Sequence, residues 1–410
     1  MKIYWDDKLK SLIDNLPSKL KRKRIELDWV LTFLAVYLIH IVCIRYYVKS
    51  FEVHKILLHP IKIIPSYLFV GWDSVWYKNL FIKYDSFVFP PMYPFTLRFI
   101  SFLFQFKEYA FEKSAVILNF ISHIIIVKAL YIYCKGLTEK KFPVWIVVFS
   151  LFFYPGHNTF FAGYTESFFL AITIIIFILR QKNKLVLASI IAGFACLLRT
   201  FAVFLVVALL LEQIFFSIRD KKIRWREIAS VTPGCIIFLC WNVFVYFYSR
   251  NFMVGQHDVL VKDLLSLYSH YAPDKAYKEM GQYDLWIKDL LTYHVPQGVN
   301  PKWWTFKYLF FSNHKEFIYV WFSIIGAIYL FLRKQYLGFF YILLFYFSMI
   351  IYTYRPFAFS RYISAFFPCF LMIAEILKER PRLQVVVISS FVIISYYFQT
   401  QLFLGFLGEP

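Results

Sequence analysis

The chain has 410 residues, of which 60% are apolar and 22% aromatic, against 17% that are charged. A soluble globular chain is about 45–50% apolar, so this composition excludes an ordinary soluble domain and predicts an integral membrane protein. The formal net charge of +20 would suggest nucleic-acid binding in a soluble protein, but most basic residues cluster at the ends of apolar segments, where they report membrane topology. We therefore expect the lipid bilayer, and no nucleic acid, as a partner.

Apolar windows of about 20 residues predict an all-α polytopic fold with about 10–11 transmembrane helices. In chain order they are residues 29–48, 114–134, 143–154, 164–179, 185–216, 228–248, 317–332, 336–354, 362–377 and 383–406. The window 143–154 is short for a full crossing, so its helix is expected to end in protein-buried surroundings. No small-residue cleavage pattern follows the first window, which is therefore expected to stay as an anchor.

Basic segments at the ends of these windows predict the topology: residues 19–24, 135–141, 180–184, 219–226, 333–334 and 378–382. If all are cytoplasmic, the window 185–216 must enter and leave on the same side. It then forms a hairpin of two short helices, with Arg199 near its tip. A charged arginine at that position needs a partner, which makes Arg199 a candidate functional residue. The plainer interpretation is that Arg199 only snorkels or pairs with a nearby acid.

The same topology divides the chain into four parts. Residues 1–28 are a basic cytoplasmic segment, 29–248 a catalytic transmembrane module with a first extracytoplasmic loop at 49–113, 249–316 an extracytoplasmic helical cap, and 317–410 a C-terminal transmembrane module. Within the first loop, residues 74–84 suit an interfacial helix with Asp73 at its start. Asp73 there is also a good helix N-cap. The prolines at 90, 91 and 94 predict an extended bend after that helix.

Polar residues converge on the extracytoplasmic face. They include Asp73, Asp85, Glu166, Arg199 and Arg361. A transporter would concentrate such groups near the bilayer midplane and show two related halves, and the sequence has no convincing internal repeat. One-sided convergence favours an enzyme that works at a membrane surface. The alternatives left open are a transporter or lipid flippase and a non-catalytic membrane subunit.

Four stretches carry a resemblance to a known family. Residues 72–77 (WDSVWY) with 89–94 (FPPMYP) resemble the "WD…FFPLYP" signature of the PIG-V family, the second mannosyltransferases of glycosylphosphatidylinositol assembly, and of its prokaryotic relatives. Residues 154–167 are similar to its "P…FFSAGYTES" turn, 192–200 to its "AG…LTRPTG" segment, and 361–362 to its late "RY" element. The sequence departs from the family at Pro91-Met92 and Phe201-Ala202, which affects acceptor identity more than fold.

The resemblance implies a GT-C glycosyltransferase that takes a sugar from a polyprenyl-phosphate donor, with an essential acid on the first external loop. That acid would be Asp73, acting as general base while a hydroxyl of a glycan or glycolipid acceptor attacks with inversion. A lipid-linked sugar presents its phosphate at headgroup depth, where Arg199 and Arg361 are the candidate ligands. Mannose is inherited from the family name, and neither the acceptor nor the oligomeric state is fixed by the residues.

The remaining candidates are expected to contact the sugar or the acceptor: Trp72, Trp76, Tyr164, Asp85 and Glu166. Both tryptophans are equally well explained as interfacial anchors, and Glu166 as a salt-bridge partner of Arg199 or Arg361. The richness in Lys, Ile, Phe and Tyr suggests an AT-biased genome, and the loop signature resembles the prokaryotic relatives more than the animal enzymes. Together they favour a prokaryotic plasma membrane over the endoplasmic reticulum, with the active face extracytoplasmic or lumenal.

Metal and redox chemistry find little support in the sequence. The nine histidines are scattered, and no Asp-x-Asp element or Gly-rich phosphate loop is present, so we expect a metal-independent enzyme with no cofactor. An ion held by Asp73 and Asp85 stays open. The six cysteines fall in or beside apolar stretches, which predicts buried thiols instead of a disulfide framework.

Overall fold

The computed structural model describes residues 18–51, 73–82, 90–137, 142–154, 158–161, 163–249, 317–351 and 362–403, and the architecture given below is that of these residues. They form α-helices and short 3-10 helices, with no strand among them. The helical cap expected at 249–316 lies outside the described residues, apart from its first position.

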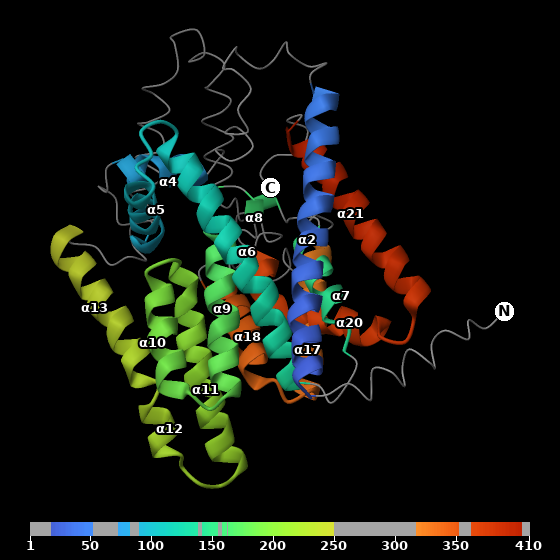
Figure 1. The fold of residues 1–410 in the computed structure, drawn as a ribbon. Coiled ribbons are helices and arrows are strands. Elements are labelled where there is room, and N and C mark those ends of the chain that lie inside the picture. The colour runs from blue at the N-terminus through green and yellow to red at the C-terminus, as the bar shows by residue number, and fades with distance from the viewer. Residues whose placement is uncertain are drawn as a thin grey trace, which may run out of the picture.

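The helices follow one another through a single bundle (Figure 1). In chain order they are α2 (Ser18–Phe51), α4 (Asp73–Ile82), α5 (Met92–Leu103), α6 (Ala110–Leu137), α7 (Val144–Phe152), α8 (Asn158–Phe161), α9 (Glu166–Gln181), α10 (Leu185–Cys196), η2 (Thr200–Ala202), α11 (Val203–Arg219), α12 (Trp225–Ala229), α13 (Thr232–Ser249), α17 (Phe317–Leu332), α18 (Tyr336–Ile351), η4 (Ser364–Cys369), α20 (Phe370–Leu377) and α21 (Pro381–Phe403). Every predicted transmembrane window overlaps at least one of them.

Among the described residues, three helical stretches are long and apolar enough to cross a membrane: Ala110–Leu137, Thr200–Arg219 and Trp225–Phe247. Apolar faces are also left exposed on the outside of the bundle. On α2 the exposed residues Leu27, Leu31, Leu34, Leu38 and Ile41 recur every three or four positions, and Ile236, Leu239, Val243 and Phe247 do so on α13. Water would not favour such stripes, whereas lipid chains would. The chain is thus an α-helical membrane protein.

The C-terminal ends of α6, α9 and α11 carry Lys135, Arg180 and Arg219 in their last turns. These three helix ends lie on one side of the bundle, which we call the basic end (Figure 1). The Gln181 amide donates to the Tyr133 carbonyl (3.2 Å), which joins the ends of α6 and α9. Arg180 pairs with Glu212 of α11, and Arg333 after α17 pairs with Glu375 of α20 (2.6 Å). Positive side chains near helix C-termini also offset the partial negative charge of the last carbonyls.

The turn after α9 shows how these ends are closed. Asn183 has a φ of 57°, the left-handed conformation, and its N–H binds the Arg180 carbonyl at 3.0 Å. The next N–H, of Lys184, binds the Leu179 carbonyl at 2.8 Å. This is a Schellman motif, which satisfies the last carbonyls of the helix and turns the chain sharply. Lys221 after α11 and Lys334 after α17 adopt the same conformation, with φ of 50° and 60°.

The helix break near Arg199 occurs where the charge pattern predicts it. Arg199 has extended backbone (φ −147°, ψ 132°) between α10 and η2, and α10 packs against α11. Its side chain contacts Glu166 at the first turn of α9, whose 16 residues span about 24 Å. The tip of the hairpin therefore lies level with the start of α9, at the end of the bundle opposite the basic end.

Small residues allow α10 and α13 to approach closely. A Cβ added at Gly193 would lie 2.9 Å from the Gly234 Cα, and one at Gly234 would overlap the Ser189 carbonyl. The Ser189 hydroxyl donates to the Val231 carbonyl at 2.6 Å and accepts from the Gly234 N–H at 2.9 Å. This contact fixes the position of α10, and hence of Arg199 beyond its end.

Two sequence expectations change and one is confirmed. The extended bend predicted from the prolines at 90, 91 and 94 does not reach Pro94, because α5 already begins at Met92. Pro94 lies in the first turn of this helix, where a missing N–H costs little. The short window 143–154 does form a short helix, α7, with most of its residues buried. All six cysteines are free, as expected, but only Cys134, Cys196 and Cys369 are buried. Cys43 and Cys235 are half-buried, and Cys240 on α13 is exposed.

Candidate functional site

The candidate site is built around a buried ion pair between α9 and the end of α10. Arg199 Nη1 donates to Glu166 Oε1 at 2.8 Å and to Thr165 Oγ1 at 3.2 Å. The Glu166 side chain is 1% exposed and that of Arg199 12%. The Glu166 carboxylate lies in the first turn of α9, where the partial positive charge of a helix N-terminus stabilises it. The ion pair that the sequence left as the alternative role of Glu166 is therefore present.

Aromatic rings enclose the Arg199 guanidinium. Its Cζ lies 5.5 Å from the ring centroid of Tyr362 and 5.9 Å from that of Phe169. A desolvated guanidinium over an aromatic face gains up to about 2 kcal/mol from each such contact. The Tyr362 ring also packs edge-on against Phe201, with centroids 5.3 Å apart. Tyr362, the second residue of the late "RY" element, thus lies at the Arg199 guanidinium.

The proline-rich stretch docks on the same helix break. The backbone N–H of Met92, the first residue of α5, donates to the Leu197 carbonyl at 2.8 Å, two residues before Arg199. The next residue, Tyr93, is fully buried, and its hydroxyl has no hydrogen-bond partner among the described residues. Burial raises the pKa of Tyr93 well above its usual range, and the nearby Tyr77 hydroxyl and Glu166 carboxylate raise this pKa further. The proline-rich stretch therefore presents a buried hydroxyl close to the ion pair.

Helix α4 carries the aspartate of the first loop to this end. Tyr77 of α4 packs edge-on against Tyr93, with ring centroids 4.9 Å apart, so α4 and α5 form one unit beside the ion pair. Asp73 is the first residue of α4, one helical turn before Tyr77. The helix expected over residues 74–84 is thus present at 73–82. Figure 1 shows α4, α5 and α8 at the end of the bundle opposite the basic end.

The other predicted site residues are distributed as follows. Tyr164 is buried and immediately precedes Thr165 and Glu166. Trp76 lies on α4, and its side chain, like that of Asp73, is outside the described part of the structure. Trp72, Asp85 and Arg361 also lie outside the described residues. Three predicted site residues, Tyr164, Glu166 and Arg199, are therefore described with their side chains.

A buried histidine network, not predicted from the sequence, supports the start of α9. His123 of α6 bonds through Nδ1 to the Tyr37 hydroxyl (2.7 Å) and through Nε2 to the Ser167 hydroxyl (3.0 Å). The Ser167 hydroxyl donates to the Phe160 carbonyl at 2.6 Å. This network connects α2, α6 and α8 to the residue that follows Glu166. A lone histidine in an apolar window carries no periodic signal, so only tertiary contacts identify it.

The geometry defines what the site can do. A guanidinium presents five N–H donors in a plane and can bridge two oxyanions, one of which here is the Glu166 carboxylate. The low polarity of the surroundings strengthens any further electrostatic contact that Arg199 makes. The arrangement therefore suits an anionic ligand such as a phosphate, with hydroxyl-bearing groups near Tyr93.

No protein-family model, no curated protein and no solved structure matches this chain.

Proposed function

We propose that this chain is a GT-C type membrane glycosyltransferase with about 10–11 crossings, in which the shorter apolar helices also span the bilayer. It moves a sugar, mannose by family resemblance, from a polyprenyl-phosphate donor to a hydroxyl of an extracytoplasmic glycan or glycolipid. One observation carries the proposal: stretches that resemble the PIG-V family, far apart in sequence, meet at one end of the bundle. Met92 binds the Leu197 carbonyl, Glu166 pairs with Arg199, and Tyr362 lies over the Arg199 guanidinium.

In the proposed reaction, Arg199 and Arg361 hold the donor phosphate. Asp73 accepts the proton of the acceptor hydroxyl as the oxygen attacks the anomeric carbon from the face opposite the phosphate. The bond between the anomeric carbon and the phosphate oxygen breaks, and the lipid phosphate leaves with the electron pair. Arginine donors stabilise the charge that develops on this leaving group. A positioned general base contributes about a hundredfold to ten-thousandfold to the rate.

The remaining residues act around these two functions. Glu166 fixes the orientation of Arg199 through their ion pair. The Tyr93 hydroxyl is buried in the structure, and in the proposed complex neighbouring side chains move so that it bonds to a sugar hydroxyl. Burial of an unsatisfied hydroxyl costs free energy, which a bound polar ligand would recover. The expected contacts of Trp72, Trp76, Tyr164 and Asp85 with sugar or acceptor remain part of the proposal.

The test uses purified full-length protein in lipid nanodiscs, incubated with radiolabelled polyprenyl-phosphate mannose and a panel of glycan and glycolipid acceptors. A transferase yields labelled acceptor, and Asp73→Asn protein at equal expression loses this product at least a hundredfold. In proteoliposomes, movement of the intact donor without bond cleavage would instead identify a flippase. Transfer by Asp73→Asn protein at the wild-type rate would remove Asp73 from the mechanism.

A further inference from the structure

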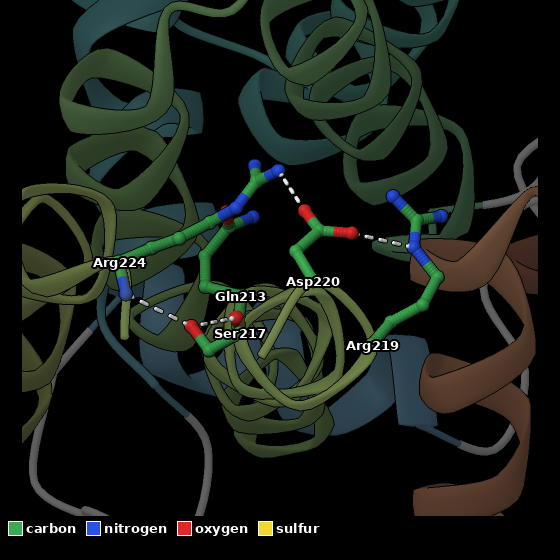
Figure 2. A network of polar contacts seen from close by, with 5 residues as sticks. All are labelled: Gln213, Ser217, Arg219, Asp220 and Arg224. Carbon is green, nitrogen blue, oxygen red and sulfur yellow. Dashed lines mark hydrogen bonds and ion pairs between the residues drawn. The ribbon is translucent and has the colours of Figure 1, made fainter. Parts of the chain in front are cut away.

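The connection between α11 and α12 is an ordered, strongly basic turn, which we call the α11–α12 tip (residues 218–226). Figure 2 shows its polar contacts: Asp220 accepts from Arg219 Nε at 2.9 Å and also from Arg224. The Arg224 N–H donates to the Ser217 hydroxyl at 3.1 Å, and that hydroxyl donates to the Gln213 carbonyl at 2.8 Å. Contacts on both flanks of the turn hold its shape.

The tip reaches beyond the other basic turns. The ion pair between Arg180 and Glu212 sets the level at which α9 ends beside α11. From Glu212 to Arg219 the helix continues for seven residues, which is about 10 Å at 1.5 Å per residue. The headgroup layer on each side of a bilayer is about 5–8 Å thick. If α9 ends at the edge of the hydrocarbon, the tip passes through the headgroup layer, and Figure 1 shows it as the farthest point of that end.

Its surface combines two kinds of exposed side chain. Ile218, Ile223 and Trp225 are 72%, 58% and 70% exposed. Around them, residues 218–226 contain five basic residues and one acid, a net charge of +4. Lys221, Lys222 and Arg226 are exposed as well. Water disfavours the apolar side chains, whereas the headgroup layer accommodates tryptophan and isoleucine together with basic residues that bind phosphate.

We propose that the α11–α12 tip is a binding surface for anionic lipid headgroups. The bilayer in which the protein sits already presents lipid phosphates at this depth, so occupation of the tip needs no additional partner. The positive charge selects anionic over zwitterionic lipids. The ion pairs of Asp220 keep Arg219 and Arg224 close to the turn, while Lys221, Lys222 and Arg226 are exposed and supply the charge that binds the lipid.

The test compares two variants that each lose three charges. The tip variant is Lys221→Gln/Lys222→Gln/Arg226→Gln. The matched control, Lys182→Gln/Lys184→Gln/Lys334→Gln, removes exposed lysines from the turns after α9 and α17. Native mass spectrometry of the full-length protein in detergent measures binding of short-chain phosphatidylglycerol and phosphatidylcholine. A basic residue at a lipid surface contributes about fivefold, so three contribute on the order of a hundredfold.

We expect the tip variant to lose phosphatidylglycerol affinity on the order of a hundredfold, and the control variant to lose less than tenfold. Higher salt should weaken this binding in the wild type, because exposed charges are screened. Equal losses of phosphatidylglycerol affinity in the two variants would show that only the net charge of the protein matters, and would overturn the proposal. Equal wild-type affinity for phosphatidylglycerol and phosphatidylcholine would also overturn it, even if the tip variant failed to fold.

Discussion

The ion pair between Arg199 and Glu166 allows a quantitative test of how the site is held. Glu166 is 2% exposed, so replacing Arg199 by glutamine leaves a buried carboxylate without its cation. Breaking a buried pair in this way costs about 3–5 kcal/mol. Glu166→Gln alone also destabilises, because the Arg199 side chain is only 12% exposed. In the double variant Arg199→Gln/Glu166→Gln the two amides can bond to each other, and we expect most of the loss to be recovered.

The assay is a double-mutant cycle on the free energy of unfolding, measured by sodium dodecyl sulfate titration in a mild detergent and followed by far-UV circular dichroism. We expect a coupling energy of about 2–3 kcal/mol. The matched control is the pair between Lys378 and Glu375 (2.8 Å), whose side chains are 42% and 20% exposed, so Lys378→Gln should cost at most about 1 kcal/mol. A coupling below about 0.5 kcal/mol at Arg199 would refute the buried pair as a structural unit.

Three further expectations test the site, the packing and the tip. Tyr93→Phe should leave the free energy of unfolding unchanged or higher, because it removes a buried hydroxyl that has no partner among the described residues. The same variant should lower sugar transfer at least tenfold, and full transfer activity would exclude a sugar contact. Gly234→Ala should cost about 1–3 kcal/mol by overlap with the Ser189 backbone. Gly338→Ala should cost less, because its Cβ would come within 3.0 Å of the end of the Leu330 side chain and would otherwise make only ordinary contacts at 3.6 Å; both values are read from denaturant titration. Hydrogen bonds from its two arginine neighbours lower the pKa of Asp220 below its ordinary 3.8, so its contribution is complete above pH 3.8 and disappears as the pH falls through the lower folded value. Melting curves at descending pH should therefore converge for wild type and Asp220→Asn, and a difference that persists in full at the lowest pH would contradict this cause.

Much of the helical architecture could be predicted because lipid and backbone impose strong rules. Apolar windows find the helices, and the basic segments 180–184 and 219–226 require the chain to turn between them near Arg199. The start of α4 at Asp73 was predictable for the same kind of local reason. Pro94 was misjudged because a proline in the first helical turn looks, in sequence, like one that breaks a helix.

Long-range contacts of the site were harder to predict. The backbone hydrogen bond from Met92 to Leu197 joins residues more than a hundred positions apart. Both side chains are apolar, so neither residue is recognisable from the sequence as part of a site. His123 and Tyr37 lie in apolar windows whose periodicity says nothing of their mutual bond. For Glu166 the sequence left two roles open, and only its distance to Arg199 reveals the ion pair.

The most direct test of the central claim is the position of the donor phosphate. We suggest an electron cryomicroscopy map of the full-length protein in nanodiscs with a non-hydrolysable polyprenyl-phosphate mannose analogue. We expect phosphate density within hydrogen-bond distance of Arg199, with the sugar directed toward α4 and Tyr93. Phosphate density at the basic end, or donor bound away from Arg199 at saturating concentration, would contradict a transferase site at this end of the bundle.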